Sequence, residues 1–329
     1  MARNPPAVAS TPLRSLVVGG SGQVGRALRE TLERRGHPVT GTYLKSSFPG
    51  GVRLGLTDSE ELRCLIDDWK PDWVFCPAAM THVDLCEDQP DHADAINHTA
   101  PAALARLAAE RGCGFVYYST DYVFDGESGP NTEEDDTHPL NVYGRSKLLG
   151  EQAVMEAYRS ATEGQARSGG ARRDRTRARR AGGWLVLRTA MVYGPDPQEK
   201  NFVYQILRHA RASSAFKAFT DQHSTPTHSG DLALCSALLA ENNLSGIYHV
   251  TGPDWLHRLE VCRLACEVFG LRDYLLRPCL TAGQKARRPL RGGLKSDKVR
   301  SALDYDLKGF REGLLAMRED LEKEEGVRS

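Results

Sequence analysis

Three side chains in the middle of the chain have the types and the order needed to move a proton to a carbonyl group. Thr120 lies in segment 119–126, which reads Ser-Thr-Asp-Tyr-Val-Phe-Asp-Gly. Tyr143 and Lys147 follow it four residues apart, so they share one face of a helix. A hydroxyl, a phenol and an ammonium in this arrangement can protonate a carbonyl oxygen while a nicotinamide delivers hydride. We therefore predict that Thr120, Tyr143 and Lys147 are catalytic.

The charge of Lys147 bears on how Tyr143 would act. A phenol with the ordinary pKa of about 10 is a poor acid–base catalyst at neutral pH. A neighbouring ammonium favours the phenolate, so we expect Lys147 to lower the pKa of Tyr143. Lys147 can also hydrogen-bond a nicotinamide ribose, and Thr120 can donate to the substrate oxygen. A Tyr-x-x-x-Lys pair often arises by chance, but here it follows a strand-terminal hydroxyl and a glycine-rich turn.

The glycine-rich turn lies near the start of the chain. Gly19, Gly22 and Gly25 follow an apolar strand at residues 16–18 and precede an amphipathic helix that ends before Gly36. Such glycines allow a tight turn, close approach of backbone N–H groups to a pyrophosphate, and close packing of the helix on the sheet. The helix N-terminus adds partial positive charge near the phosphates. The turn predicts a dinucleotide site formed by Gly19, Ser21, Gly22, Gln23, Val24, Gly25 and Arg26.

The choice of dinucleotide depends on the end of the second strand. NAD-binding sites usually carry an acidic residue about 20 residues beyond the turn, which binds the ribose hydroxyls. Residues 42–47 contain no acid. Lys45 and Arg26 could instead meet a 2′-phosphate, which favours NADPH. NADH stays open, because either cation could equally be an ordinary solvated side chain.

Strands and helices alternate around these motifs, as is typical of βαβ units and a parallel sheet. Ligands bind outside the carboxyl ends of such strands, where Thr120 is expected. We predict an α/β fold with a Rossmann-type doubly wound parallel sheet and a smaller C-terminal substrate-binding lobe. Strands are expected at 16–18, 39–43, 73–76, 115–118, 184–187 and 247–250, and helices up to about 35 and at 60–69, 101–110 and 142–159.

The predicted domain organisation places a disordered N-terminus at 1–13 and the NAD(P)-binding Rossmann domain at 14–190. The substrate-binding lobe occupies mainly 191–329, with 245–252 returning to the Rossmann sheet. Segment 160–183 is rich in Gly, Ala and Arg, so we expect a disordered insertion that buries little apolar surface. Its arginines do not alternate with aromatic residues that could stack on bases, which disfavours nucleic acid as a partner.

The composition favours a cytoplasmic protein without nucleic-acid or membrane partners. Lys+Arg and Asp+Glu balance at 43 each, so no global charge attracts a polyanion. No stretch approaches the roughly 18 apolar residues that span a bilayer, and segment 1–12 lacks the apolar run of a signal peptide. The 8 cysteines are scattered, which fits a reducing compartment. No metal site is predicted, because one candidate cluster matches none of the usual zinc spacings. That cluster comprises Cys76, His82, Asp84 and Cys86.

Three segments carry a resemblance to a known family. The turn at 19–25, the string at 119–126 and segment 141–151 resemble the extended short-chain dehydrogenase/reductase superfamily, and more narrowly its dTDP-4-dehydrorhamnose reductase branch. The string at 119–126 is highly specific to this branch, and the resemblance extends over most of the chain. Further matches lie at 78–84, 95–97, 188–189, 201–203, 221–222 and 226–227.

The resemblance implies an activity and further site residues. Hydride would pass from NADPH to C4 of a nucleotide-linked 4-keto-6-deoxyhexose, with Tyr143 protonating the oxygen, Lys147 supporting it and Thr120 orienting the carbonyl. The expected partner is a nucleotide-sugar small molecule, and a homodimer is compatible with the sequence. Implied cofactor contacts are Ala78, Ala79, Asn97 and Lys147. Implied substrate contacts are Thr81, Val83, Asp84, Asp121, Met191, Asn201 and Phe202.

Some positions depart from the family pattern. Met191 stands where rhamnose-forming enzymes usually have a Trp beside the sugar, and Gly55 replaces an acid that often contacts adenine. The Arg-rich insertion is also outside the pattern. The regulatory β subunit of methionine adenosyltransferase shares the fold, binds NADP and also lacks this Trp. The resemblance therefore leaves a second hypothesis open, a non-catalytic NADP-binding regulatory subunit.

Overall fold

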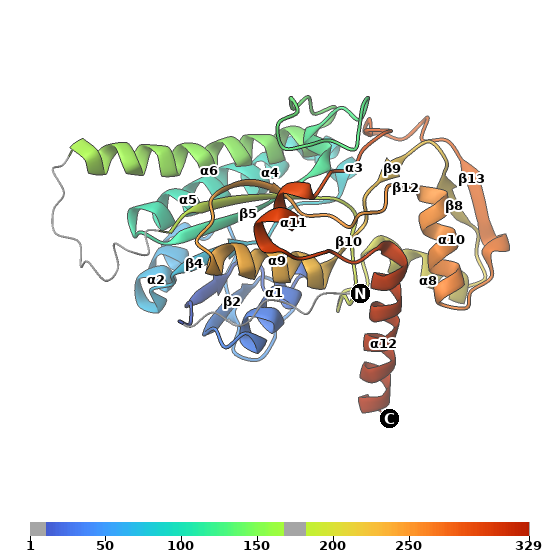
Figure 1. Ribbon diagram of the computed structural model, residues 1–329, viewed down its shortest axis with the longest axis horizontal. Helices are drawn as coiled ribbons and strands as arrows, with labels where there is room; N and C mark the ends of the chain where they lie inside the picture. Colours follow the sequence, from blue (N-terminus) through green and yellow to red (C-terminus); the bar gives the residue numbers. More distant parts are fainter. Residues whose placement is uncertain (1–10, 168–181, 329) are drawn as a thin grey trace.

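A parallel sheet of seven strands forms the centre of the computed structural model, which describes residues 11–167 and 182–328 (Figure 1). Its strand order is β11-β6-β5-β4-β1-β2-β3, and each neighbouring pair is parallel. Strands β2 and β3 lie on one side of β1 and the later strands on the other, so the order reverses next to β1. The predicted Rossmann-type doubly wound sheet is confirmed. The strands are β1 (Ser15–Val17), β2 (Val39–Tyr43), β3 (Val52–Arg53), β4 (Trp73–Cys76), β5 (Gly114–Thr120), β6 (Trp184–Thr189) and β11 (Gly246–His249).

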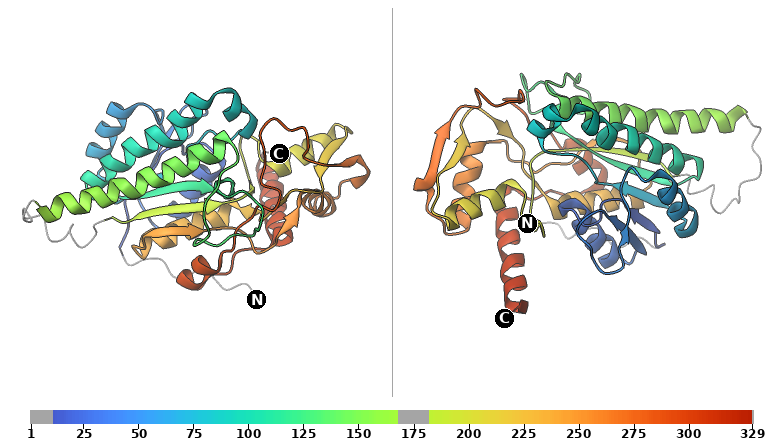
Figure 2. Two further views of the ribbon diagram at one scale, coloured as in Figure 1. Left: turned by 90° about the horizontal axis from the view of Figure 1, so that it is seen from above. Right: turned by 180° about the vertical axis from the view of Figure 1, so that it is seen from behind.

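Helices cover both faces of this sheet and enclose two apolar cores (Figure 2). One core lies between the sheet and α1 (Gln23–Arg34), α9 (Ser229–Glu241) and α11 (Asp297–Leu303). The other lies under α2 (Ser59–Trp69), α5 (Ala100–Glu110) and α6 (Val142–Arg167). Short helices α3 (Val83–Asp88) and α4 (Pro90–Asp94) lead into a π-helical turn, η1 (Ala95–Thr99), just before α5.

Strands β1, β4 and β5 are buried along their whole length rather than on alternate residues. This pattern follows from a parallel sheet that is covered on both faces. Strand β5 extends beyond the predicted residue 118, so Thr120 is its last residue. The hydroxyl singled out in the sequence thus lies at the carboxyl edge of the sheet, and the 3₁₀ turn η2 (Asp121–Val123) follows it directly.

A smaller lobe with its own apolar core lies beside the carboxyl edge of the sheet (Figure 1). Its helices are α8 (Phe202–Arg211), α10 (Arg258–Val268) and α12 (Phe310–Arg328). Two-stranded pairs complete this lobe and its junction with the sheet. They join β7 (Val192–Tyr193) to β10 (Thr227–His228), β9 (His223–Ser224) to β12 (Leu256–His257), and β8 (Phe216–Phe219) to β13 (Leu276–Cys279), which follows η3 (Asp273–Leu275).

The chain returns to the sheet earlier than the sequence indicated. Helix α9 packs on α1, and its Glu241 carboxylate binds the Arg35 guanidinium at 2.6 Å and the His37 ring at 2.7 Å. Strand β11 then pairs with β6. Nothing in the spacing of apolar residues distinguishes a helix that packs on the sheet from one that packs in the lobe, so the position of α9 was missed.

Helix α6 also differs from the prediction, because it continues through Arg167 instead of ending near residue 159. Ion pairs along its surface favour the extra turns: Arg159 bonds Glu156 at 2.8 Å and Glu163 at 2.5 Å. Residues 168–181 of the predicted insertion, and 1–10 of the predicted N-terminal segment, lie outside the described residues. Across the parts of the chain that the structure describes, no helix has the length and hydropathy needed to cross a bilayer.

Candidate active site

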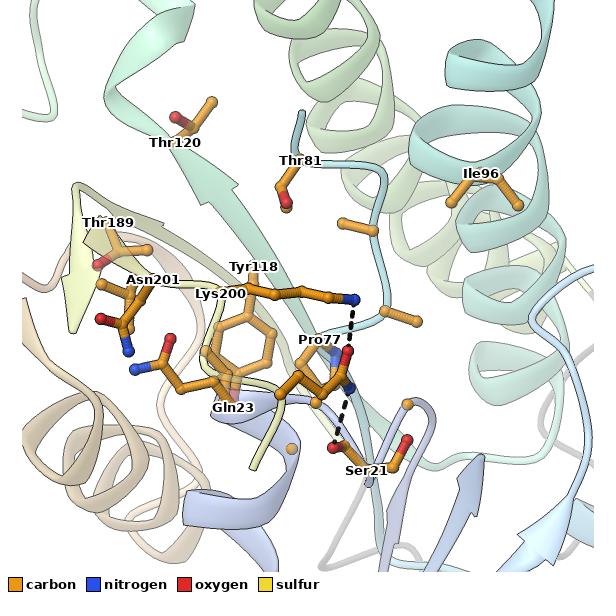
Figure 3. Close-up of a pocket in the computed structure, with 18 of the residues that line it drawn as sticks. Ser21, Gln23, Pro77, Thr81, Ile96, Tyr118, Thr120, Thr189, Lys200 and Asn201 are labelled. Carbon is orange, nitrogen blue, oxygen red and sulfur yellow. Dashed lines mark hydrogen bonds between the residues drawn. The ribbon is translucent and has the colours of Figure 1, made fainter. Parts of the chain in front are cut away.

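A cavity of about 840 Å³ opens at the carboxyl ends of β1, β4, β5 and β6 and reaches the lobe. Figure 3 shows Ser21 of the glycine turn on one side of this space and Thr120 on the other, with Asn201 of the lobe between them. The predicted site residues that line it are Gly19, Ser21, Gly22, Gln23, Val24, Gly25, Lys45, Ala78, Ala79, Thr81, Val83, Thr120, Asp121, Tyr143, Lys147, Met191 and Asn201. Those outside its lining are Arg26, Asp84, Asn97 and Phe202.

The three glycines of the turn have different local roles. Gly19 has a φ of +93°, a conformation that favours glycine, and a Cβ there would lie 2.9 Å from the Cβ of Ala78. A Cβ on Gly25 would overlap the carbonyl oxygen of Gly19, so this glycine lets α1 pack against the turn. A Cβ on Gly22 would meet nothing closer than 3.6 Å, and Gly22 lines the cavity. The packing of the turn therefore disfavours a side chain at Gly19 and Gly25, whereas Gly22 leaves open space where a ligand could approach.

The two cations proposed for a 2′-phosphate lie in different surroundings. Lys45 follows β2, is exposed and lines the cavity. Arg26 instead bonds Glu30 at 2.6 Å on the surface of α1 and is not part of the cavity lining. A helical i,i+4 pair engages its guanidinium locally. Of the two cations only Lys45 lines the cavity, and the contact of either with a 2′-phosphate stays a prediction.

The predicted catalytic residues meet at one end of the cavity. Thr120 donates a hydrogen bond to Asp121 Oδ1 at 3.2 Å and accepts one from the Tyr122 backbone N–H at 3.2 Å. Tyr143 lies in the first turn of α6, with its ring edge-on to the Tyr122 ring and a centroid separation of 5.7 Å. All of these side chains line the cavity, as does Lys147 one turn further along α6.

The pKa of Tyr143 shifts in the direction opposite to the one expected from the sequence. Burial raises the pKa of Tyr143 above its ordinary value, and the hydrogen bond with Thr120 only partly offsets this. The charge of Asp121 acts in the same direction as burial. The Lys147 ammonium lies 4.0 Å from the centroid of the Tyr117 ring. The prediction that Lys147 lowers the pKa of Tyr143 is therefore wrong in this structure, because removing the phenol from water outweighs the favourable contacts.

Lys147 is itself buried, and this burial lowers its pKa to about 8. The charge of Glu151 opposes the shift from one turn further along α6. Glu151 in turn forms a buried ion pair with Arg188 of β6 at 2.7 Å and accepts a hydrogen bond from Ser119 of β5. This network joins α6 to β5 and β6 directly beneath Thr120. These residues lie in segments that resemble the family, but the resemblance implied no role for them.

Asn97 supports the cavity wall without lining it. Its amide accepts from the Met80 N–H at 2.9 Å and donates to the Met80 carbonyl and to Ser146 Oγ, each at 3.0 Å. These bonds hold the loop after β4 against α6, and Asn97 is fully buried. Asn97 therefore supports the loop that carries Ala78, Ala79 and Thr81, and its direct contact with a cofactor stays a prediction.

Asp84 forms contacts within the fold that the sequence did not predict. Its carboxylate forms an ion pair with Arg288 at 2.8 Å and accepts from the Ala286 N–H at 3.0 Å. The bond to Arg288 lowers the pKa of Asp84 although its partial burial opposes this. Asp84 therefore ties segment 286–288 to the start of α3, and its contact with substrate stays a prediction. The sequence carried no signal of a partner 204 residues away.

The lobe side of the cavity is formed by the start of α8 and the segment before it. Asn201 caps α8, accepting from Val203 and Tyr204 N–H groups at 3.1 and 3.2 Å, and donates to the Gly194 carbonyl at 2.9 Å. Phe202 points the other way and packs on the Phe216 ring, which explains why it does not line the cavity. The amide of Asn201 is thus engaged in bonds that cap α8, although the residue still lines the cavity.

Segment 198–200, which precedes α8, contacts the glycine turn. The Gln198 amide donates to the Ser21 carbonyl at 3.4 Å, and the Lys200 ammonium donates to Gln198 Oε1 at 2.6 Å, as the dashed lines in Figure 3 show. Both residues line the cavity, and neither was predicted. Met191, which lies between β6 and β7, has a φ of 40°, in the left-handed region that non-glycine residues rarely adopt. Met191 therefore departs from the family pattern in residue type and also has an unusual backbone conformation.

Two further groups shape the end of the cavity near Thr120. Asp121 is buried, and this burial raises its pKa to about 6. Arg258, the first residue of α10, lines the cavity and was missed because it lies far in sequence from every recognised motif. No group of three or more His, Cys, Asp or Glu side chains in residues 11–167 and 182–328 could hold a metal ion. His82 instead caps α3, accepting from the Leu85 N–H at 3.1 Å.

The sheet, the glycine turn and the cavity at the strand ends define a Rossmann-type protein with a dinucleotide-binding turn. The chain belongs to the RmlD substrate binding domain family, which matches residues 13–162 and 174–323. This result confirms the resemblance inferred from the sequence motifs. A probable low-salt glycan biosynthesis reductase of Haloferax volcanii is 31% identical over 312 residues, covering 92% of this chain and 96% of that protein. The methionine adenosyltransferase 2 subunit beta of Mus musculus is 30% identical over 309 residues, covering 92% and 86%.

Solved structures of reductases have the same architecture. A dTDP-4-dehydrorhamnose reductase from Clostridium acetobutylicum superposes with a TM-score of 0.79 at 27% identity, covering 94% of this chain and 100% of that one. A dTDP-4-dehydrorhamnose reductase from Bacillus anthracis, solved in complex with NADP, gives a TM-score of 0.80 at 24% identity, with coverage of 94% and 100%. The second likeness shows the fold alone.

Proposed function

We propose that this chain reduces the 4-keto group of a nucleotide-activated 6-deoxyhexose with NAD(P)H, and that it prefers NADPH. The observation that carries the proposal is the meeting of Thr120, Tyr143 and Lys147 in the same cavity as a dinucleotide-type glycine turn. Family membership and the reductases among the relatives support this choice of chemistry.

The residues of the turn fit a dinucleotide. The first N–H groups of a helix have no partner within the helix, and α1 presents them beside Gly22, where no side chain blocks a pyrophosphate. Lys147 would bind the nicotinamide ribose, and Lys45 would meet a 2′-phosphate, which favours NADPH over NADH. Ala78 and Ala79 would form the wall behind the cofactor. When bound, the nicotinamide supplies the hydride.

Tyr143 would donate the proton to the carbonyl oxygen. Because burial raises its pKa, the phenol carries its proton at neutral pH, which is the form needed for reduction. Thr120 would hydrogen-bond the same oxygen and orient the carbonyl towards the phenol. The ammonium of Lys147 would stabilise the negative charge that develops on Tyr143 as the proton leaves.

The remaining lining residues would select the sugar. Thr81 and Val83 lie on the loop after β4, while Asp121, Met191 and Asn201 border the space towards the lobe. Met191 offers a flexible thioether where the family usually offers an aromatic platform. We therefore infer that Met191 contributes to the choice of the 6-deoxyhexose.

The test is to follow NADPH and NADH oxidation with a panel of nucleotide-linked 4-keto-6-deoxyhexoses. We expect turnover with at least one of them, and faster turnover with NADPH. Tyr143→Phe should abolish turnover while the affinity for NADPH stays within about twofold of wild type, since only the proton donor is removed. Turnover by Tyr143→Phe at the wild-type rate would contradict the mechanism.

The relative named as a subunit of methionine adenosyltransferase supports a second candidate, a non-catalytic NADP-binding regulatory subunit. Its identity to this chain is close to that of the reductase relative. Both candidates require cofactor binding, and only the first requires turnover. Tight NADPH binding together with no oxidation by any substrate of the panel would therefore favour the regulator.

A further inference from the structure

Tyr122 is the aromatic neighbour that limits where the Tyr143 ring can lie. The two rings meet edge-on, with their centroids 5.7 Å apart and their planes at 70°. The backbones also meet closely, because a Cβ on Gly144 would overlap the Tyr122 carbonyl oxygen. The first turn of α6 therefore packs directly against η2, and the position of the Tyr122 side chain determines the space left for the Tyr143 ring.

The backbone of Tyr122 is fixed locally, but its ring is not. Tyr122 is the middle residue of η2, and its N–H donates to Thr120 Oγ1 at 3.2 Å. This bond holds the turn and leaves the phenol ring free to rotate about its side-chain torsions. The ring lines the cavity and is only partly buried. A contact at the hydroxyl end is therefore needed to keep it in one orientation.

Gln222 supplies that contact from the lobe. Its Nε2 amide donates to the Tyr122 hydroxyl oxygen at 3.1 Å, across 100 residues of the sequence. Gln222 directly precedes β9, is buried and does not line the cavity. Its carbonyl oxygen accepts from the Arg258 N–H at 2.9 Å, which joins it to the start of α10. The amide is therefore held by the lobe, while its donor reaches the residue that packs on Tyr143.

The bond between Gln222 and Tyr122 can affect catalysis more than folding. A neutral hydrogen bond adds only about 1 kcal/mol to stability. A misplacement of about 1 Å between reacting groups can lower a rate by about 100-fold. The adjacent Asp221 has a different kind of partner, because it accepts from the Thr281 hydroxyl at 2.8 Å within the lobe. Of these two neighbouring side chains, only Gln222 reaches towards the proposed proton donor.

We propose that Gln222 is a positioning residue, which acts through Tyr122 to fix the Tyr143 ring for proton transfer and to link that ring to the lobe. This inference rests on the proposed function for the identity of the reaction, but the position of the ring can be measured without any substrate. Because Gln222 belongs to the lobe and Tyr143 to the Rossmann domain, a movement of the lobe would be transmitted to the proton donor.

The first experiment is NMR of the full chain with ¹³C in its tyrosine rings. Tyr143→Phe identifies the Tyr143 signals by their disappearance. The π electrons of Tyr122 shift the signals of nearby nuclei, so the Tyr143 signals report the relative position of the two rings. Gln222→Met removes the amide donor with little change in side-chain volume, and we expect it to shift the Tyr143 signals.

The second experiment measures NADPH oxidation by the same variants with a nucleotide-linked 4-keto sugar. Gln222→Met should lower kcat roughly tenfold, while the KM for NADPH changes by less than about twofold, since only the proton donor is misplaced. Tyr122→Phe keeps the ring and removes the hydroxyl, so it should lower kcat by a similar factor. Because both substitutions break the same bond, the double variant should lose no more than either single variant.

Thr281→Val is the matched control, because it removes a hydrogen bond from the residue next to Gln222. That bond joins the Thr281 hydroxyl to Asp221 Oδ2 and lies within the lobe. Thr281→Val and Gln222→Met should lower the melting temperature to a similar small extent, since each removes one neutral donor. Only Gln222→Met should change kcat and the Tyr143 signals.

Unchanged Tyr143 signals in Gln222→Met would overturn the inference, as would an equal loss of kcat in Thr281→Val. Loss of all turnover in Tyr122→Phe, together with a wild-type kcat in Gln222→Met, would also reject it and would give Tyr122 a direct contact with substrate. Shifted Tyr143 signals in a protein without reductase activity would support the positioning contact and reject the proposed reaction.

Discussion

Alanine at Gly22 and alanine at Gly25 should separate cofactor binding from folding, although both glycines belong to the same turn. A Cβ at Gly22 would point into the cavity and meet no atom closer than 3.6 Å, so the fold can accept it. A Cβ at Gly25 would overlap the Gly19 carbonyl oxygen and lie 2.8 Å from the Gly20 Cα. Both of these neighbours are backbone atoms, which cannot rotate away as a side chain could.

The magnitudes follow from this difference. Gly22 is the N-cap of α1 with an extended backbone, a conformation that alanine adopts, so Gly22→Ala should change the free energy of unfolding by about 1 kcal/mol or less. Overpacking at Gly25 costs about 1–3 kcal/mol or more, and the better helix propensity of alanine returns about 1 kcal/mol. Because the overlap is with backbone atoms, we expect the upper end of this difference, a destabilisation of about 2 kcal/mol for Gly25→Ala. The methyl of Gly22→Ala would occupy the approach of the pyrophosphate, so its affinity for NADPH should fall at least roughly tenfold.

The assay pairs urea denaturation with fluorescence titration of NADPH for each variant. Wild-type NADPH affinity in Gly22→Ala would refute the assignment of the turn to a pyrophosphate, whatever its stability. A Gly25→Ala protein as stable as wild type would refute the packing argument. Gly36→Ala provides a control outside the cavity. A Cβ at this position meets no neighbour, but the alanine has to adopt a φ of +77°. It should be destabilised by about 1 kcal/mol and bind NADPH normally.

Two further predictions concern the cations of the cavity. Burial lowers the pKa of Lys147 to about 8, so the ammonium is present below that pH and lost above it. The kcat/KM for NADPH should therefore decline as pH rises through about 8, whereas a profile flat up to pH 10 would contradict a role for the charge. Lys45→Ala should raise the Kd for NADPH roughly tenfold and leave that for NADH unchanged. Equal losses for both cofactors, measured by titration, would argue against contact with a 2′-phosphate.

The parts of the fold that were predictable are those with local causes. Strand β4 was predicted with its observed bounds, because four consecutive apolar residues lie between Asp72 and Pro77, which interrupts a strand. The turn at 19–25 was recognisable because backbone geometry favours glycine at Gly19 and Gly25. The bounds of α6 were not predictable to the same degree, since surface ion pairs extended a helix whose composition resembles a disordered segment.

The parts of the site that were missed depend on contacts between residues distant in sequence. Asp84 and Arg288 lie 204 residues apart, and only the folded chain shows that they neutralise each other. Arg258 and Phe202 likewise come from different helices of the lobe. A sequence motif records which residue types are present, but the partner that satisfies a charge determines whether that charge remains available for a ligand.

Tyr143 shows what this distinction means for mechanism. From the sequence, the phenol and the ammonium of Lys147 formed an isolated pair in which charge alone would lower the pKa of the phenol. In the fold both groups are buried, and burial disfavours each charged form, raising the pKa of Tyr143 and lowering that of Lys147. A neutral phenol can donate a proton, so burial keeps Tyr143 in the form that carbonyl reduction needs. A raised pKa also makes that proton harder to release, so its transfer would depend on the hydrogen bond with Thr120 and on the charge of Lys147 to stabilise the phenolate that forms.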